Sequence, residues 1–219
     1  MLQRRFRLLI FDWDGTLLDS IGSIVGCVQA TLSELGEPTA DEERIRASIG
    51  LGLRETVEMF RPGCSDELFD RVVEVYRKLW EETFSKSPHV FPGVPELLET
   101  LEARGYLLAI ATAKSRVGLL HDLERTNLSR RFHSTRTIDE APSKPHPGML
   151  HGILGELCAG ANESLMIGDT VHDLAMAANA GMPAIAVLSG CEARENLEPW
   201  RPQACFESVT ELPSWLGAD

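Results

Sequence analysis

The sequence predicts an α/β protein in which a parallel sheet carries helices on both faces and a separate helical domain follows the first strand. Short apolar runs alternate with helical patterns over most of the 219 residues, which is typical of a parallel sheet. One long interval, between Phe11 and Leu107, holds helical patterns alone and breaks this alternation. Polar residues follow several predicted strands at their carboxyl ends, where open α/β sheets bind ligands.

Four short apolar runs have the length and composition of buried strands. They are Arg7–Phe11, Leu107–Ala111, Ser164–Ile167 and Pro183–Leu188, with Phe132–Ile138 and Ala204–Val209 as weaker candidates. Apolar residues at helical spacing between these runs predict core helices. The helical patterns cover Val94–Arg104, Arg116–Leu128, Pro147–Leu157 and Val171–Ala180.

The interval after the first strand is too long for an ordinary connection between parallel strands. A strand–helix–strand unit needs roughly 30 residues, and a structureless loop of this length is rare in a compact protein. Four segments of the interval show helical spacing, over Ser20–Leu35, Asp41–Ser48, Leu53–Phe60 and Ser65–Phe84. The sequence therefore predicts a core of residues 1–17 and 89–219 and an inserted helical domain of residues 18–88.

The composition is that of an acidic protein of ordinary globular type. Hydrophobic residues make up 43% and charged residues 25%, and the formal net charge is −12. Such a chain is a poor binder of nucleic acid or of an anionic membrane. The five cysteines form no C-x-x-C pair, which favours reduced thiols and a cytoplasmic location. The apolar run at Leu8–Phe11 is too short for a signal peptide, and no stretch approaches a membrane span. Oligomeric state cannot be inferred from these features.

Two acids, Asp12 and Asp14, follow the first strand, and Gly15 after them permits a tight turn. Side chains two residues apart on a strand share a face. Paired carboxylates suit a hard cation such as Mg²⁺, and one can act as a nucleophile while its neighbour transfers a proton. A calcium-binding EF-hand loop is excluded because Leu17 and Ser23 stand where Gly and Glu are required. Plain turn residues are the remaining alternative.

Further polar residues follow the other strands. Thr112 follows the second strand, Asp169 follows the strand at 164–167, and Asp173 lies one helical turn later on the same side. Each acid alone would be an ordinary helix start, but next to Asp12 they predict a metal site. Lys144 lies between two chain breakers, so we expect an exposed loop lysine that could balance carboxylates and a phosphate. Thr112 could bind an anion or cap the following helix.

Four segments carry a resemblance to a known family. They are FDWDGTLLDS at 11–20, ATAKS at 111–115, SKPHPGML at 143–150 and GDTVHDLAMAANAG at 168–181. In order and spacing they resemble the haloacid dehalogenase superfamily, within its phosphoglycolate-phosphatase-like branch, along nearly the whole chain. The resemblance implies a Rossmann-like core with a mobile helical cap, and Mg²⁺-dependent phosphoryl transfer from a small phosphorylated metabolite.

The resemblance also implies roles for individual residues. Asp12 would be the nucleophile and Asp14 the general acid and base, while Thr112 and Lys144 would hold the transferring phosphoryl group. Asp169 would bind the metal together with Asp12 and the backbone carbonyl of Asp14.

The positions around these residues complete the implied site. Asp173 would support the metal-binding acids, and Gly15, Thr16 and Ala113 would line the phosphate position. Ala113 stands where many relatives carry Asn, a departure that could alter the local hydrogen bonding.

Several alternatives stay open at this point. A phosphomutase shares all of these residues, and phosphoglycolate, pyrophosphate, a sugar phosphate and a nucleotide are all candidate substrates. Haloacid dehalogenases and phosphonatases lack the second acid, so Asp14 argues against both. A dehydrogenase is disfavoured because Gly50 and Gly52 lack the rest of a G-x-G-x-x-G fingerprint. A non-catalytic phosphate-binding or scaffold protein is the alternative from another class.

The stretch IGLGLR at 49–54 is rich in glycine and lies between two helical patterns. It therefore predicts a loop of the inserted domain, and in relatives such a loop reaches over the active site. Arg54 is then the candidate for a second anionic group of the substrate, such as a carboxylate. The alternative, of equal weight, is a solvated residue at a helix start.

Overall fold

The computed structural model of the chain describes residues 5–86 and 88–217. In this part of the chain six strands form one sheet in the order β3-β2-β1-β4-β5-β6, and every neighbouring pair is parallel. The strands are β1 (Leu8–Phe11), β2 (Leu107–Ala111), β3 (Ser134–Arg136), β4 (Ser164–Gly168), β5 (Ala184–Val187) and β6 (Cys205–Phe206). The predicted parallel sheet is confirmed. The two weaker strand candidates form β3 and β6, which are short strands at the two edges of the sheet.

Helices cover both faces of the sheet because the strand side chains alternate between two apolar clusters. Leu9 and Phe11 of β1 join the cluster beneath α5 (Val94–Ala103), α6 (Arg116–Arg125) and α10 (Leu212–Leu216). Leu8 and Ile10 join the opposite cluster beneath α7 (Gly148–Glu156), α8 (Val171–Asn179) and α9 (Arg194–Leu197). All four β1 side chains are fully buried, and each contributes roughly 1.5–3 kcal/mol by leaving water. The short helices α9 and α10 were not predicted from the sequence.

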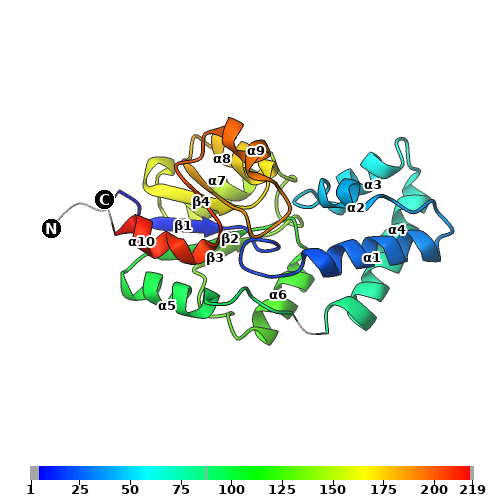
Figure 1. Ribbon diagram of the computed structural model, residues 1–219, viewed down its shortest axis with the longest axis horizontal. Helices are drawn as coiled ribbons and strands as arrows, with labels where there is room; N and C mark the ends of the chain where they lie inside the picture. Colours follow the sequence, from blue (N-terminus) through cyan, green and yellow to red (C-terminus); the bar gives the residue numbers. More distant parts are fainter. Residues whose placement is uncertain (1–4, 87, 218–219) are drawn as a thin grey trace.

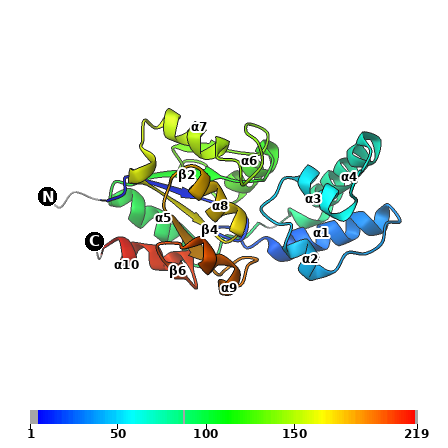
Figure 2. The same cartoon turned by 90° about the horizontal axis from the view of Figure 1, so that it is seen from above.

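A helical domain lies between β1 and α5 in the chain and forms the cap. It contains α1 (Ile21–Glu34), α2 (Glu42–Arg46), α3 (Leu53–Phe60) and α4 (Asp66–Leu79), which continues as a π-helix at Trp80–Phe84. Figures 1 and 2 show these helices together at one end of the molecule, beyond the end of the sheet toward which β1 points. The predicted inserted domain is therefore present. Its boundaries at residues 18 and 88 stay a prediction.

Side-chain caps begin several of the helices, and Ser20 before α1 is an informative departure from this pattern. The side chains of Asp41, Ser65 and Ser115 accept hydrogen bonds from backbone N–H groups at the starts of α2, α4 and α6. Ser20 occupies the same position before α1, but its side chain makes no cap bond. It donates instead to Asp14, 2.7 Å away. Within the described residues, no helix is both long and apolar enough to cross a membrane.

Candidate active site

The sheet topology brings distant polar residues to one edge. Phe11 at the end of β1 pairs with Ile110 of β2 and with Ile167 of β4. The residues that follow these three strands therefore leave the sheet at one level. They are Asp12, Thr112 and Asp169, and the chain supplies all three from the carboxyl ends of neighbouring strands, as the sequence predicted.

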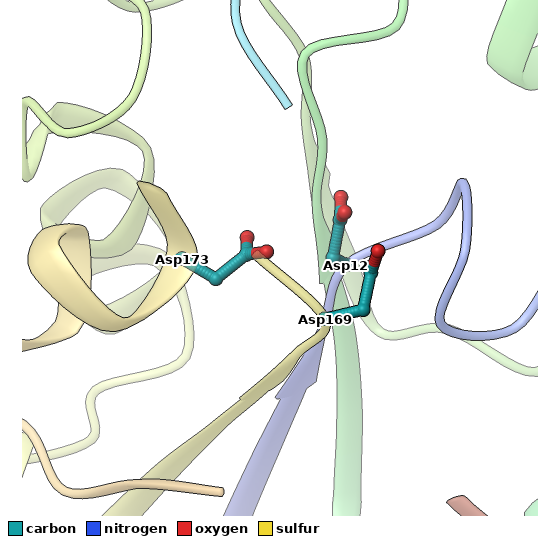
Figure 3. A group of neighbouring side chains, drawn as sticks. All are labelled: Asp12, Asp169 and Asp173. Atoms are coloured by element: carbon teal, nitrogen blue, oxygen red, sulfur yellow. The ribbon is translucent and has the colours of Figure 1, made fainter. Parts of the chain in front are cut away.

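Three carboxylates converge at this edge. Asp12, Asp169 and Asp173 each offer one oxygen, and these oxygens lie within 4.8 Å of one another. Figure 3 shows the three side chains turned toward a common point, with Asp173 reaching in from the first turn of α8. Asp12 is 3% exposed and the other two are fully buried. Three carboxylates this close repel one another strongly unless a positive charge is present.

Lys144 supplies part of that positive charge. Its Nζ lies 2.7 Å from Oδ1 of Asp12 and 2.6 Å from Oδ1 of Asp173. The side chain is 1% exposed, so the expectation of an exposed loop lysine was wrong. Ser143 and Pro145 correctly predict a loop at Lys144. The side chain is buried because it pairs with Asp12 and Asp173, which are distant in the sequence.

Burial and mutual repulsion shift the proton affinities of these groups. Burial raises the pKa of Asp12 to about 7, and Asp173 adds to the shift while Lys144 opposes it. Burial and the nearby Asp12 also raise the pKa of Asp169 well above its usual range. For Lys144, burial lowers the pKa, but Asp12 and Asp173 raise it by more, so the ammonium form is favoured. These shifts in pKa show that the ionised carboxylates need more positive charge than the single lysine supplies.

The cluster fits a divalent cation on both charge and ligand type. Three carboxylates face one ammonium, which leaves two negative charges in excess when all are ionised. Carboxylate oxygens are the donors that Mg²⁺ prefers. Asp12 and Asp169 were expected to bind the metal and Asp173 to support them, and all three lie in the group. The expected contribution of the Asp14 backbone carbonyl stays a prediction.

Two glycines allow the Asp169 carboxylate to sit where it does. Gly15 has φ +86°, and a Cβ there would lie 2.4 Å from Oδ2 of Asp169, while a Cβ on Gly190 would lie 1.8 Å from the same atom. Thr16 donates to Oδ1 of Asp169 at 2.8 Å, and the backbone N–H of Cys191 donates to Oδ2 at 3.1 Å. The loop at 190–191 was missed by sequence reasoning, because its contribution is a backbone N–H and the lack of a side chain.

Asp173 is held by the helix that carries it. Its Oδ2 accepts from the backbone N–H of Thr170 at 3.1 Å and from the Thr170 hydroxyl at 2.7 Å, which forms a capping box at the start of α8. The other oxygen, Oδ1, is the one near Lys144. Asp173 therefore caps α8 with one oxygen and pairs with Lys144 through the other. A residue at a helix start can in this way also belong to the acid cluster.

Asp14 points away from the acid cluster. Its Oδ1 accepts from the Ser20 hydroxyl at 2.7 Å and from Nζ of Lys114 at 2.9 Å. Lys114 also lies 3.1 Å from Oδ2 of the buried Asp122. Lys114 follows β2, and its pairing with Asp14 was not foreseen because Asp14 follows a different strand, β1.

Thr112 is 1% exposed and lies at the same edge. Its hydroxyl accepts from the backbone N–H of Lys114 at 3.2 Å. The following helix is capped by Ser115, whose side chain accepts from Gly118, so Thr112 is not the helix cap. Thr112 and Ala113 both line the cavity described below, and their phosphate-binding roles stay predictions.

A cavity of about 1060 Å³ lies between core and cap. Its core side includes Asp12, Asp14 and Thr112, and its cap side includes side chains of α3 and α4. The two domains touch beside it, since the backbone N–H of Gly52 donates to the Ser143 hydroxyl at 2.9 Å. Asp12 of the acid cluster and the cap therefore face one continuous space.

Arg54 lies in the cap wall of this cavity. Its guanidinium stacks over the Phe69 ring, 3.9 Å from the centroid, and one nitrogen lies 3.2 Å from Oδ1 of Asp66. The Arg54 side chain is 59% exposed and that of Asp66 is 87% exposed, so this surface ion pair is weak. Arg54 therefore borders the cavity, and its weak ion pair with Asp66 can be exchanged for a contact with another anion.

The fold and the site together define an α/β protein with a cluster of buried acids at the carboxyl edge of a parallel sheet and a helical cap above it. The family model for haloacid dehalogenase-like hydrolases matches residues 9–187. The chain belongs to this family.

Relatives and a solved structure agree along nearly the full length. The probable phosphatase IndB of Dickeya dadantii is 37% identical over 94% of this chain and 91% of that protein. Pyrophosphatase PpaX of Anoxybacillus flavithermus is 30% identical over 95% and 96%, and phosphoglycolate phosphatase of Vibrio parahaemolyticus is 28% identical over 97% and 96%. A hydrolase from Pseudomonas syringae has a TM-score of 0.89 at 26% identity, covering 97% of this chain and 98% of that one.

The excess negative charge of the cluster predicts that Mg²⁺ stabilises the folded protein. At free Mg²⁺ about 100-fold above its Kd, we expect the Tm to rise by about 5–10 °C. Asp169→Asn should lose most of this rise because it removes one charged ligand. Glu99→Gln, which changes an exposed acid on α5, is the matched control and should keep it. Thermal unfolding followed by circular dichroism, with and without Mg²⁺, measures the effect. An equal rise in Asp169→Asn and the wild type would place the cation elsewhere.

Proposed function

We propose that the protein is a Mg²⁺-dependent phosphatase that hydrolyses a small phosphorylated metabolite through an aspartyl-phosphate intermediate. The observation that carries the proposal is the position of Asp12. It lies at the core end of the cavity between core and cap, in contact with Lys144 and inside the acid cluster. The phosphatase and pyrophosphatase relatives along the full chain support the same reaction class.

Asp12 is the proposed nucleophile. Phosphoryl transfer has a loose transition state, so it depends mainly on position and on neutralising charge. One oxygen of Asp12 is held near Lys144, which leaves the other to attack phosphorus and displace the alcohol of the substrate. Lys144 and Thr112 would hold oxygens of the phosphoryl group. The ammonium of Lys144 also favours the charged, nucleophilic form of Asp12.

Asp14 is the proposed general acid and base. It lines the same cavity but is turned away from the acid cluster, so it can face the leaving oxygen. Asp14 would donate a proton to that oxygen when the aspartyl phosphate forms. It would then take a proton from the water that hydrolyses the intermediate. Asp12, Asp169 and the backbone carbonyl of Asp14 would hold Mg²⁺, with Asp173 as a supporting acid, and the ion when bound would neutralise the charge on the phosphoryl oxygens.

The substrate is open among several phosphorylated metabolites. Phosphoglycolate is one candidate, since a relative carries that activity in its name, and pyrophosphate is another on the same ground. The cavity volume of about 1060 Å³ leaves room for leaving groups much larger than glycolate, such as sugars and nucleosides. A panel of such substrates compared by kcat/KM separates these candidates and would also show a phosphomutase. A non-catalytic scaffold would show no turnover with any of them.

The proposed location is the cytoplasm, which the cysteines support. All five are free thiols in the structure, as expected in a reducing compartment.

The Asp12→Asn variant tests the nucleophile. An amide cannot attack phosphorus, so we expect turnover of every substrate to fall by at least about 10³-fold, while circular dichroism shows a normal fold. Mass spectrometry must confirm that the amide has not deamidated. If the folded, intact variant turned over at a rate near that of the wild type, the assignment of Asp12 would be wrong.

Metal exchange tests the cofactor. EDTA should abolish phosphatase activity and Mg²⁺ should restore it. Ca²⁺ should support little activity because it prefers more ligands and looser geometry. Initial rates in protein stripped of metal, with each ion added back, provide the measurement. Full activity in stripped protein would contradict a metal-dependent reaction.

The Arg54→Ala variant tests the cap wall. If Arg54 leaves Asp66 to bind an anionic leaving group, kcat/KM for the best anionic metabolite should fall about 10- to 100-fold, the loss of one charged hydrogen bond of roughly 1.5–3 kcal/mol. The rate with p-nitrophenyl phosphate should change little. Arg71→Ala, an exposed arginine of α4 outside the cavity lining, is the control. Equal losses on both substrates would point to a role in the fold.

A further inference from the structure

A chain of polar contacts runs from the interior of the core to Asp14. The Trp13 indole Nε1–H donates to Oδ2 of Asp122 at 3.1 Å, and Nζ of Lys114 lies 3.1 Å from that same oxygen. Lys114 then donates to Oδ1 of Asp14 at 2.9 Å. Asp122 and Trp13 are 1% and 0% exposed, so the far end of this chain is fixed in the core.

The two oxygens of Asp14 are in different surroundings. Lys114 and Ser20 both donate to Oδ1. Among the residues that the structure describes, no hydrogen bond to Oδ2 of Asp14 is found. Asp14 is one of the residues that line the cavity. Two donors on one oxygen fix the plane of the carboxylate and leave the other oxygen for a group inside the cavity.

The cap covers this arrangement. The ring of Trp80, in the π-helix that ends the cap, lies 4.8 Å from Nζ of Lys114, within range of a cation–π contact. The side chains of Lys114 and Asp14 are 9% and 14% exposed. Groups from α6, from the loop after β1 and from the cap therefore meet at one ammonium. Shielding from water strengthens the ion pair.

We propose that Lys114 is a positioning residue for Asp14. Lys114, fixed by Asp122 and covered by Trp80, holds Asp14 by Oδ1 so that Oδ2 faces the leaving oxygen of the substrate. This inference rests on the proposed phosphatase function, in which Asp14 transfers the proton. It concerns the direction of the Asp14 carboxylate and adds no new step to the reaction.

The test compares two kinds of leaving group. An alkoxide must be protonated as it departs, whereas p-nitrophenolate leaves without a proton. The value of kcat/KM reports the steps up to formation of the aspartyl phosphate. In Lys114→Met we expect kcat/KM to fall about 10- to 100-fold for the best alkyl phosphomonoester of the panel, a part of the range for general acid catalysis. With p-nitrophenyl phosphate, we expect a change of less than about threefold.

Matched variants separate positioning from other effects. Lys78→Met removes an exposed lysine of α4 that lies outside the cavity lining and should change neither substrate. Lys114→Arg keeps the charge and should recover part of the alkyl phosphomonoester rate. Because Lys114→Met leaves Asp122 buried without its cation, that variant could unfold. The double variant Lys114→Met/Asp122→Asn removes both charges, keeps an acceptor for Trp13, and should show the same selective loss.

The outcomes distinguish this inference from the proposed function. A selective loss with the alkyl substrate, in the single or the double variant, supports the positioning role. Equal losses with both substrates in folded protein overturn it, since they indicate a structural role. A loss confined to substrates with a second anionic group also overturns it, since Lys114 would then bind substrate directly. Activity that survives in Asp12→Asn would instead refute the proposed function itself.

Discussion

The structure depends on a buried imbalance of charge at the carboxyl edge of the sheet. Asp12, Asp169 and Asp173 are buried within reach of one another and share one ammonium, that of Lys144. Such a cluster costs folding free energy unless a cation joins it. The parallel topology brings Asp12 and Asp169 together, because β1 pairs directly with β4 and an acid follows each strand. The same surplus negative charge, when all three acids are ionised, fits the charge of a divalent cation.

The cap contributes a different kind of surface, an apolar wall of half-buried side chains. Helix α4 has no buried residue, although Phe69, Val73 and Tyr76 lie on one helical face by their spacing. All three line the cavity above the acid cluster. Tyr76 of this face also packs against the apolar cluster of the cap. In the proposed function, the acid edge of the core would bind the phosphoryl group and this wall of the cap would enclose the leaving group.

Sequence reasoning succeeded where the signal was carried by the backbone pattern. The alternation of strands and helices, the inserted helices and the acids after β1 and β4 follow from apolar periodicity and from the ends of strands. It failed where the position of a side chain depends on a contact with a residue that is distant in the sequence. Lys144 was expected in solvent because its neighbours are chain breakers, yet it is buried against two acids, one after β1 and one in α8. The loop at Gly190 was missed because its contribution is the absence of a side chain, which leaves room for the Asp169 carboxylate.

The segment Asp12-Trp13-Asp14 shows how neighbouring acids acquire different chemistry. Trp13, between them, is fully buried and hydrogen-bonded to Asp122, so the backbone there is anchored to the core. Asp12 turns toward Lys144, while Asp14 turns toward Lys114 and Ser20. Each acid thus has its own lysine, held in place by a second acid of its own. Because the two ion pairs share no member, the proposed nucleophile and the proposed proton carrier lie two residues apart without competing for the same cation.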